Sequence, residues 1–136
     1  MQILKKSKEA RIYSDFDLRF GIHPFTKDLN IKTNDLSIKQ SLKNLILTRN
    51  YERPFHPEIG CQINSLLFEP FNDITSNVMR KTIFSAVEKF EPRIILNDVQ
   101  ISMDENNLNS LSVILDYTIK NNELPYVYAI NLKRVR

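Results

Sequence analysis

The sequence predicts an α+β fold, with N-terminal helices packed on a C-terminal antiparallel β-meander. Apolar residues recur with the period of an α-helix in the stretches before residue 92. After that position the apolar period changes to two, which is typical of strands with one buried face. No repeat and no long linker interrupts the chain, so residues 1–136 are predicted to form a single domain.

The helix predicted over residues 75–90 organises the rest of the chain. Thr75 is expected to cap its start, because a threonine hydroxyl can accept a hydrogen bond from an otherwise unpaired backbone N–H. Pro92 disfavours helical geometry at Glu91 and lacks the N–H of a further turn, so the helix is expected to end there. Arg93 then opens a strand. The apolar face of this helix is formed by Met79, Ile83, Ala86, Val87 and Phe90.

A second helix and two irregular segments are predicted nearer the N-terminus. Residues 12–20 carry scattered apolar side chains among acidic ones, which favours a short edge strand, and residues 21–34 are predicted to form a loop. A helix is expected to start at Asp35 or Ser37 and to end near residues 48–50. Its apolar face is formed by Ile38, Leu42, Leu45 and Ile46.

Residues 51–60 are predicted to form an ordered turn, because two prolines and a glycine fall within them. Phe55 and Ile59 are expected to anchor this turn in the core. Residues 61–68 are predicted to form a short helix, and Cys61 at its start is expected to be a small buried residue.

The C-terminal third is predicted to form three strands, because apolar and polar residues alternate along it. The predicted strands include residues 99–103, 111–119 and 126–132. Polar turns are predicted at residues 104–109 and 121–122.

Composition limits the function classes open to the chain. The net charge of +3 and the pI of about 9.0 are a weak sign of an acidic or a nucleic-acid partner. A single cysteine excludes an internal disulfide and favours a reducing compartment during synthesis. Neither a signal peptide nor a stretch of roughly 20 apolar residues is visible, so no membrane contact is expected. Residues 1–11 are expected to fray or to dock on a partner, and residues 133–136 form a basic tail.

Several motifs in the middle of the chain resemble those of one protein family. They are Ser41 to Arg49, then Arg53 to Cys61 (RPFHPEIGC), then Leu67-Phe68-Glu69, and then Phe90-Glu91-Pro92-Arg93-Ile94. Their order and spacing are similar to those of the baseplate wedge protein of contractile-tailed phages, which is related to the small baseplate component of type VI secretion systems. The resemblance covers roughly residues 12–120. Residues 50–52 depart from it, since many members place a glycine before the arginine.

The resemblance implies a structural role in the virion tail baseplate, after assembly in the host cytoplasm. It implies that Glu91, Pro92 and Arg93 engage a helical bundle built by the larger wedge proteins. Arg53 and Glu58 belong to the same expected partner-binding set. An internal role stays open, in which Arg93 pairs with Glu91 or holds the turn of residues 53–61 through Glu58.

The resemblance also implies that the sheet of this chain is similar to that of the tail sheath protein. This sheet would template the first sheath ring by β-strand addition. The tail sheath protein is therefore an expected partner, with the tail tube or hub proteins as further candidates. Strand addition needs unpaired N–H and C=O groups on a sheet edge. The residues expected in the sheath-edge strands are Tyr117, Ile119, Tyr126, Tyr128 and Ile130.

The main alternative is an enzyme, a lysozyme-like glycosidase that degrades peptidoglycan, because such a label has been attached to this family. That chemistry needs two carboxyl groups flanking a cleft, one of them with a raised pKa. Glu58, Glu69, Asp73 and Glu91 qualify by residue type alone, and the chain has no tryptophan for stacking on a sugar. The chain is therefore predicted not to be an enzyme.

Neither a cofactor nor a nucleic-acid partner is expected. His23 and His56 each lie beside a proline, and no cluster of Cys, His and carboxylates has the spacing of a metal site. Basic residues at both ends of the chain are balanced by acids and lack the interleaved aromatics of a nucleic-acid surface.

Overall fold

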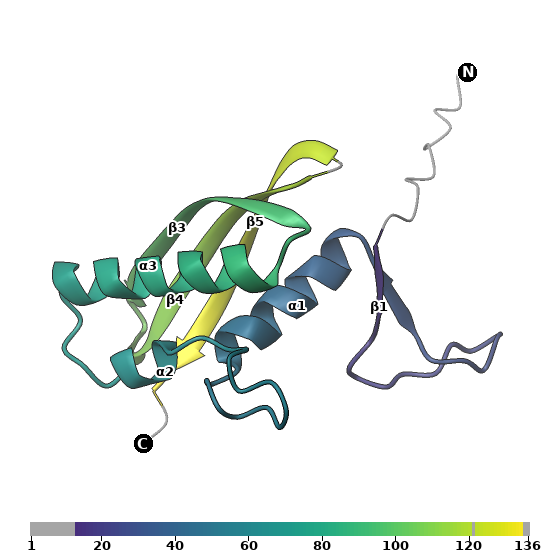
Figure 1. Cartoon of the computed structure of the whole chain (residues 1–136), viewed down its shortest axis with the longest axis horizontal. Coiled ribbons are helices and arrows are strands. Elements are labelled where there is room, and N and C mark those ends of the chain that lie inside the picture. The colour runs from purple at the N-terminus through teal and green to yellow at the C-terminus, as the bar shows by residue number, and fades with distance from the viewer. Residues whose placement is uncertain (1–12, 121, 135–136) are drawn as a thin grey trace. The chain divides into compact units, whose positions relative to one another are not determined.

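The computed structural model describes residues 13–120 and 122–134, and it confirms the predicted α+β class. Its contacts divide the chain into two compact units, Met1–Ile38 and Lys39–Arg136 (Figure 1). The first unit holds a two-stranded sheet, and the second holds a three-stranded sheet and two complete helices. The prediction for residues 1–11 falls outside the described residues.

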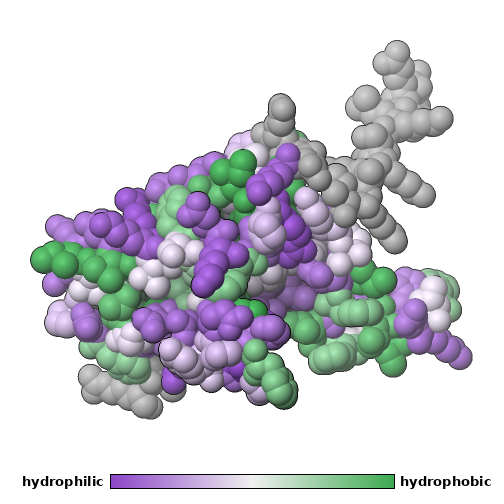
Figure 2. Space-filling view, in the orientation of Figure 1, coloured by the Kyte–Doolittle hydropathy of each residue, from purple (hydrophilic) through white to green (hydrophobic). Residues whose placement is uncertain are grey.

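The first unit is built on a short antiparallel pair, β1 (Ser14–Phe16) and β2 (Ile31–Thr33). The strand predicted over residues 12–20 is thus present but shorter. The loop predicted over residues 21–34 is wrong in part, because it contains β2 and a bridge between Ile22 and Leu29. Its mixed polar and apolar sequence does not signal these backbone pairings. Hydrophobic side chains gather on the surface of this unit (Figure 2), and they include Phe16, Leu18, Phe20, Ile22 and Phe25.

The helix α1 (Asp35–Leu47) agrees with the predicted start and ends close to the predicted end. Asn34 precedes it and accepts a hydrogen bond from the Ile38 N–H at 3.1 Å. All the residues predicted for its apolar face are buried, namely Ile38, Leu42, Leu45 and Ile46.

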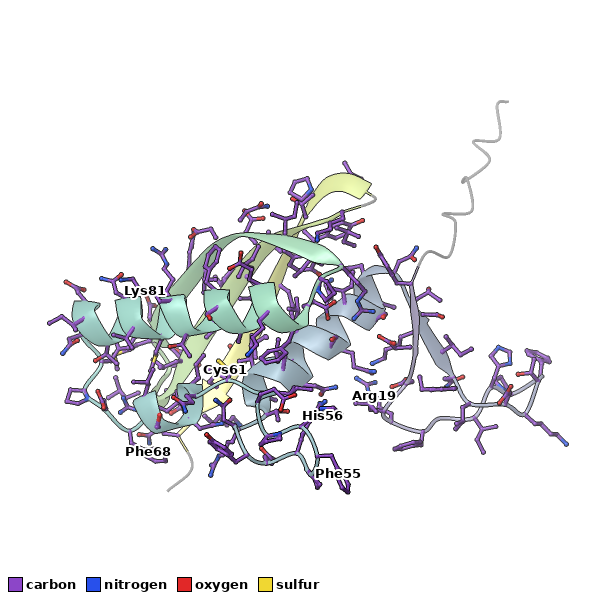
Figure 3. The ribbon with its side chains drawn as sticks, viewed as in Figure 1. Arg19, Phe55, His56, Cys61, Phe68 and Lys81 are labelled. Carbon is purple, nitrogen blue, oxygen red and sulfur yellow. The ribbon has the colours of Figure 1, made fainter. Side chains whose placement is uncertain are left out.

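Residues 51–60 form a turn, as predicted, but Phe55 does not anchor it in the core. The Phe55 side chain is 97% exposed and points away from the helices at the tip of the turn (Figure 3), while Ile59 is half-buried. Phe55 has a φ of 69°, which marks a tight bend at the tip. The helix α2 (Ile63–Leu66) is shorter than the predicted segment 61–68.

The helix α3 (Asp73–Phe90) begins before the predicted start, and its N-cap is Asn72 rather than Thr75. The Thr75 N–H donates to Asn72 Oδ1 at 2.7 Å, and the Thr75 hydroxyl donates to the Pro70 carbonyl at 3.0 Å. Asparagine is as good a cap as threonine, and apolar periodicity does not distinguish between them. No helix in the described ranges is both long and apolar enough to cross a membrane.

The second sheet is the predicted antiparallel meander, with β3 (Ile94–Asp104), β4 (Asn107–Ile119) and β5 (Asn122–Lys133) in the order β3-β4-β5. The strands run further than predicted, because Asp104 pairs with Asn107 and Ile119 pairs with Asn122. Backbone pairing therefore extends each strand into the polar turns that the sequence predicted.

One face of this sheet forms the core, and α3 lies against it (Figure 1). At its centre the Tyr117 ring is fully buried and stacks on the Tyr126 ring, with 5.9 Å between the ring centroids. The buried residues of this face include Ile94, Val99, Val113, Leu115, Tyr117, Ile119 and Ile130. The predicted basic tail overlaps β5, which ends at Lys133, and Arg134 Nη2 donates to the Glu69 carbonyl at 2.8 Å.

Candidate functional site

The chain leaves α3 through Glu91, whose carboxylate is the centre of a buried hydrogen-bond network. Arg93 Nε donates to Glu91 Oε1 at 2.6 Å, and Arg93 Nη2 donates to Oε2 at 2.9 Å. The Ser41 hydroxyl of α1 donates to the same Oε2 at 2.5 Å. Glu91 therefore connects the end of α3 and the start of β3 to the middle of α1.

This ion pair differs from an ordinary surface pair. The Glu91 side chain is 3% exposed and the Arg93 side chain 22% exposed. Two parallel N–H···O bonds hold the guanidinium in one orientation, which a point charge such as lysine cannot reproduce. The structure thus resolves one alternative left open by the sequence, since Glu91 and Arg93 pair with each other. Pro92 between them is exposed.

Arg53 and Glu58, the other predicted partner-binding residues, lie in the turn of residues 51–60 and are exposed. The Glu58 carboxylate lies 3.3 Å from His56 Nδ1, so it is paired within its own turn. Its own backbone N–H and the His56 ring lower the pKa of Glu58.

The backbone gives this turn a defined shape. The Tyr51 N–H donates to the Pro57 carbonyl at 2.9 Å, and the Cys61 N–H donates to the Thr48 carbonyl at 2.9 Å. Gly60 has a φ of 152°, and a Cβ there would lie 2.8 Å from the backbone carbon of Arg49. Only glycine fits this position without moving the backbone.

The two edges of the three-stranded sheet differ. Arg80 Nε of α3 donates to the Val99 carbonyl at 2.6 Å, and this contact occupies an acceptor on the outer edge of β3. The β3–β4 register also shifts between Leu96 and Asp98. A bulge and a covered carbonyl both hinder the addition of another strand. The edge of β3 is therefore partly blocked.

Among the described residues, no strand pairs with the outer edge of β5. In an antiparallel ladder, successive residues turn their N–H and C=O groups alternately toward and away from a given neighbour. Since the Val99 carbonyl points away from β4, its partner Leu115 turns its own groups toward Tyr128 of β5. Val127 and Ala129, on either side of Tyr128, then direct their N–H groups outward.

This topology corrects part of the predicted sheath edge. Tyr117 and Ile119 lie in β4, the central strand, so the prediction that they belong to an edge strand is wrong. Both sides of β4 are paired, and both side chains are buried. Tyr126, Tyr128 and Ile130 do lie in an edge strand, β5.

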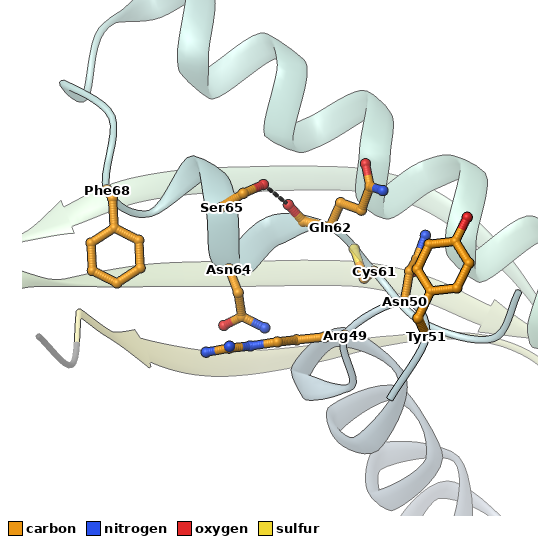
Figure 4. Close-up of a pocket in the computed structure, with 8 residues that line it drawn as sticks. All are labelled: Arg49, Asn50, Tyr51, Cys61, Gln62, Asn64, Ser65 and Phe68. Carbon is orange, nitrogen blue, oxygen red and sulfur yellow. Dashed lines mark hydrogen bonds between the residues drawn. The ribbon is translucent and has the colours of Figure 1, made fainter. Parts of the chain in front are cut away.

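No described cavity contains the carboxylate pair of a glycosidase. The cavity next to α2, of about 390 Å³, has no carboxylate in its lining (Figure 4). Three other cavities, of about 430, 280 and 160 Å³, are each lined by a single carboxylate. These carboxylates are Glu58, Glu88 and Asp15, respectively. Among the described residues, no group of three or more His, Cys, Asp and Glu side chains could hold a metal ion.

Cys61 is unsuited to nucleophilic catalysis. Its side chain is buried, and burial raises the pKa of the thiol to about 11. The thiolate is the reactive form, so the Cys61 thiol is unreactive at neutral pH.

Sequence reasoning missed the contacts that Ser41 makes at the corner and that Arg80 makes at the sheet edge. Ser41 is separated from Glu91 by 50 positions, and Arg80 is separated from Val99 by 19. Each contact depends on how the helices pack on one another or on the sheet. Ser41 belongs to one of the family-like motifs, but that motif does not indicate its partner.

Three solved structures share this fold at low sequence identity. A Geobacter sulfurreducens protein provisionally described as a tail lysozyme has a TM-score of 0.67 and 23% identity, covering 73% of this chain and 89% of that one. A chain of the anti-feeding prophage baseplate has a TM-score of 0.63 and 17% identity, covering 91% and 87%. A chain of the type VI secretion baseplate complex has a TM-score of 0.62 and 16% identity, covering 74% and 93%. The protein thus has a fold that occurs in baseplates.

Sequence similarity shows the family. The family model for baseplate wedge protein gp25 matches residues 32–124. Baseplate wedge protein gp25 of Enterobacteria phage T4 is 36% identical over 109 residues, which cover 80% of this chain and 75% of that protein. The chain belongs to the baseplate wedge protein gp25 family, which confirms the resemblance seen in its motifs.

Proposed function

We propose that this chain, a structural baseplate wedge component by its family, connects the wedge core to the tail sheath and templates the first sheath ring. In this role it acts by assembly alone, without a catalytic step, a cofactor, a membrane or a nucleic acid. It would assemble in the host cytoplasm and remain in the virion tail baseplate, where the tail tube or hub proteins are further neighbours. The observation that carries this proposal is the difference between the partly blocked edge of β3 and the edge of β5, which no described strand covers.

The attachment to the larger wedge proteins is assigned to the corner of Glu91, Pro92 and Arg93. Glu91 is nearly inaccessible, so its role is to position Arg93 rather than to touch a partner. Pro92 and the exposed part of the Arg93 side chain form the contact surface, and Arg53 and Glu58 in the exposed turn of residues 51–60 are assigned to the same partner. A rigid, pre-paired corner loses little side-chain entropy when it docks.

The attachment to the sheath is assigned to the outer edge of β5. The outward groups of Val127 and Ala129 can pair with an added strand, which would extend the sheet from three strands to four. The side chains of Tyr126, Tyr128 and Ile130 lie on the core side of the same strand, so they hold β5 in place.

The first experiment mixes the protein with the larger wedge proteins of the same phage and measures co-elution by size exclusion with light scattering. Wild type is compared with Arg93→Ala, and Ser41→Ala is the matched control, because it removes the other hydrogen bond to Glu91 and leaves Pro92 and Arg93 in place. Circular dichroism checks that all three are folded. We expect wild type and Ser41→Ala to co-elute and Arg93→Ala not to.

Equal co-elution of all three variants would move the wedge contact away from the corner. If Arg93→Ala and Ser41→Ala lose co-elution equally, Arg93 acts only by holding the shape of the corner. If folded wild type does not bind folded wedge proteins, the connecting role is wrong.

A glycosidase is the second candidate, favoured by the fold shared with the Geobacter protein. The described cavities argue against it, because none pairs two carboxylates. A glycosidase would release sugars from purified peptidoglycan, and Glu58→Gln or Glu91→Gln would abolish the release. We expect no release from wild type.

A further inference from the structure

One cavity lies beside the corner at which α3 ends. It has a volume of about 280 Å³, and Pro92 is one of its lining residues. On the helix side it is lined by Phe84, Val87 and Glu88, which fall at i, i+3 and i+4 and therefore share one side of α3. On the sheet side it is lined by residues 94–96, the first three of β3. We call this cavity the Pro92 groove.

The lining of the Pro92 groove is mostly apolar. Six of its eight lining residues have apolar side chains, and the two charged ones, Glu88 and Lys120, have opposite signs. The groove therefore offers no net charge to an occupant. Nucleic acid needs positive charge that neutralises its phosphates, and a charged peptide would be attracted by one of these residues and repelled by the other. The lining thus favours an uncharged, apolar occupant.

The groove combines buried apolar residues with exposed ones. Val87 and Ile94 are 1% and 6% exposed, so they belong to the core and give the groove a fixed wall. Ile95 is 54% exposed, Pro92 is exposed and Phe84 is half-buried. Apolar surface that gathers in a concave site is typical of a contact with another apolar group, because docking removes both surfaces from water.

The size and the position of the groove identify the kind of occupant. Pockets that hold a drug-sized molecule have about 300–1,000 Å³, and the Pro92 groove is slightly smaller, so an apolar side chain suits it better than a free ligand. Pro92 both lines the groove and belongs to the contact surface assigned to the larger wedge proteins. A partner that docks on Pro92 is therefore in contact with the groove as well.

We propose that the Pro92 groove receives an apolar side chain of the larger wedge protein that docks on the corner. This inference rests on the proposed attachment at Glu91, Pro92 and Arg93, and it adds a specific anchor to that attachment. Stable interfaces combine an apolar centre with a polar rim. The groove supplies the apolar part of this contact, and Arg93 supplies the polar part.

The Pro92 groove and the proposed sheath contact lie at opposite edges of the three-stranded sheet. The groove is lined by β3 and the sheath contact is assigned to β5, which are the two outer strands in the order β3-β4-β5. A side chain in the groove consequently leaves the outer edge of β5 accessible. One copy of the chain can then hold the wedge protein and the sheath protein at the same time.

The first test measures the dissociation constant of the full chain and the larger wedge proteins of the same phage by titration calorimetry. Ile95→Gln makes one wall of the groove polar at similar size. Leu108→Gln is the matched control, because Leu108 is a strand residue that is 72% exposed and lines none of the four cavities described above. With folding checked by circular dichroism, we expect Ile95→Gln to weaken binding about tenfold and Leu108→Gln to bind like wild type.

A second test measures whether the partner covers the groove. Ile95→Cys and Leu108→Cys are alkylated with N-ethylmaleimide, free and in the wedge complex, and mass spectrometry follows the modification of this chain. The native Cys61 is buried, so the introduced thiol is the one that reacts. We expect the complex to protect Ile95→Cys from alkylation and to leave Leu108→Cys as reactive as in the free chain.

The proposal is overturned if Ile95→Gln binds as tightly as wild type, if Leu108→Gln weakens binding equally, or if Ile95→Cys is alkylated as fast in the complex as in the free chain. If Arg93→Ala weakens binding and Ile95→Gln does not, the corner attachment stands and only the groove is wrong. If wild type binds no wedge protein, the attachment itself fails and the groove proposal fails with it. Protection of Ile95→Cys in a concentrated sample of this chain alone would overturn the proposal in favour of a second copy.

Discussion

Arg93 holds the Glu91 carboxylate with two hydrogen bonds, of 2.6 and 2.9 Å, at the point where α3 gives way to β3. Pro92 lies between them and cannot donate a backbone hydrogen bond. The Glu-Pro-Arg sequence thus ends a helix, turns the chain and neutralises a buried charge within three residues. A change at Arg93 consequently affects folding as well as docking.

Arg93→Ala should lower the free energy of unfolding by about 2–4 kcal/mol, because it leaves the buried Glu91 carboxylate without its counter-charge. Arg93→Lys should lower it less, since lysine keeps the charge but donates as a single point. Urea denaturation followed by circular dichroism measures both. If Arg93→Ala lowers the free energy of unfolding by less than about 0.5 kcal/mol, the Glu91–Arg93 pair contributes no more than an ordinary surface ion pair.

Gly60→Ala should lower the free energy of unfolding by about 2–4 kcal/mol, because the new Cβ would lie 2.8 Å from the Arg49 backbone and φ is positive. Gly21→Ala is the matched control. Its Cβ would meet the movable Asn30 side chain, and its φ is not in the left-handed region. Thermal unfolding of both variants measures the difference. Equal losses would mean that the Gly60 backbone conformation is not required.

The Cys61 thiol should make stability depend on alkaline pH. Burial raises its pKa from 9.0 to about 11, so the folded chain keeps a proton that the unfolded chain releases. Stability from this group is fully present below pH 9 and is lost as the pH rises toward 11, by up to about 3 kcal/mol. Urea denaturation of wild type and Cys61→Ala at pH 8 and pH 11 isolates this contribution from that of the lysines. Parallel pH profiles would show that the thiol is not desolvated.

Arg80→Ala should expose the outer edge of β3, because it removes the donor to the Val99 carbonyl. The expected result is concentration-dependent self-association through edge pairing, with a stability loss of only about 0.5–1.5 kcal/mol. Light scattering over a concentration series measures this association. The control is Lys81→Ala, on the same helix without a bond to the sheet, which should remain monomeric to the same extent as wild type. A monomeric Arg80→Ala would show that the bulge alone protects this edge.

Local patterns predict much of this fold because they reflect local physics. The apolar face of α3 and the alternation along β4 follow from the helical and strand periods. Burial confirms both, except that Phe90 at the end of α3 is only half-buried. Phe55 shows the limit of that reasoning. An aromatic residue between prolines suggests an anchor, yet the backbone bends at this position and the ring faces solvent.

The site was less predictable than the fold, because it depends on contacts between distant segments. The Glu-Pro-Arg motif marks the corner, but only packing brings Ser41 to the Glu91 carboxylate. The order of the strands in the sheet could not be predicted from the sequence either. Tyr117 and Tyr126 are equally strand-like in sequence, and only the order β3-β4-β5 makes one central and the other part of an edge strand.

Ala129→Pro should block sheath attachment while leaving the fold intact. The ladder directs the Ala129 N–H away from β4, and proline is tolerated on an edge strand where its missing N–H would face solvent. Ala129→Thr keeps this N–H and is the matched control. Both variants should co-elute with the larger wedge proteins like wild type, whereas only Ala129→Pro should fail to recruit the sheath protein of the same phage to the wedge complex. Normal sheath recruitment by a folded Ala129→Pro would show that the added strand does not pair at this edge.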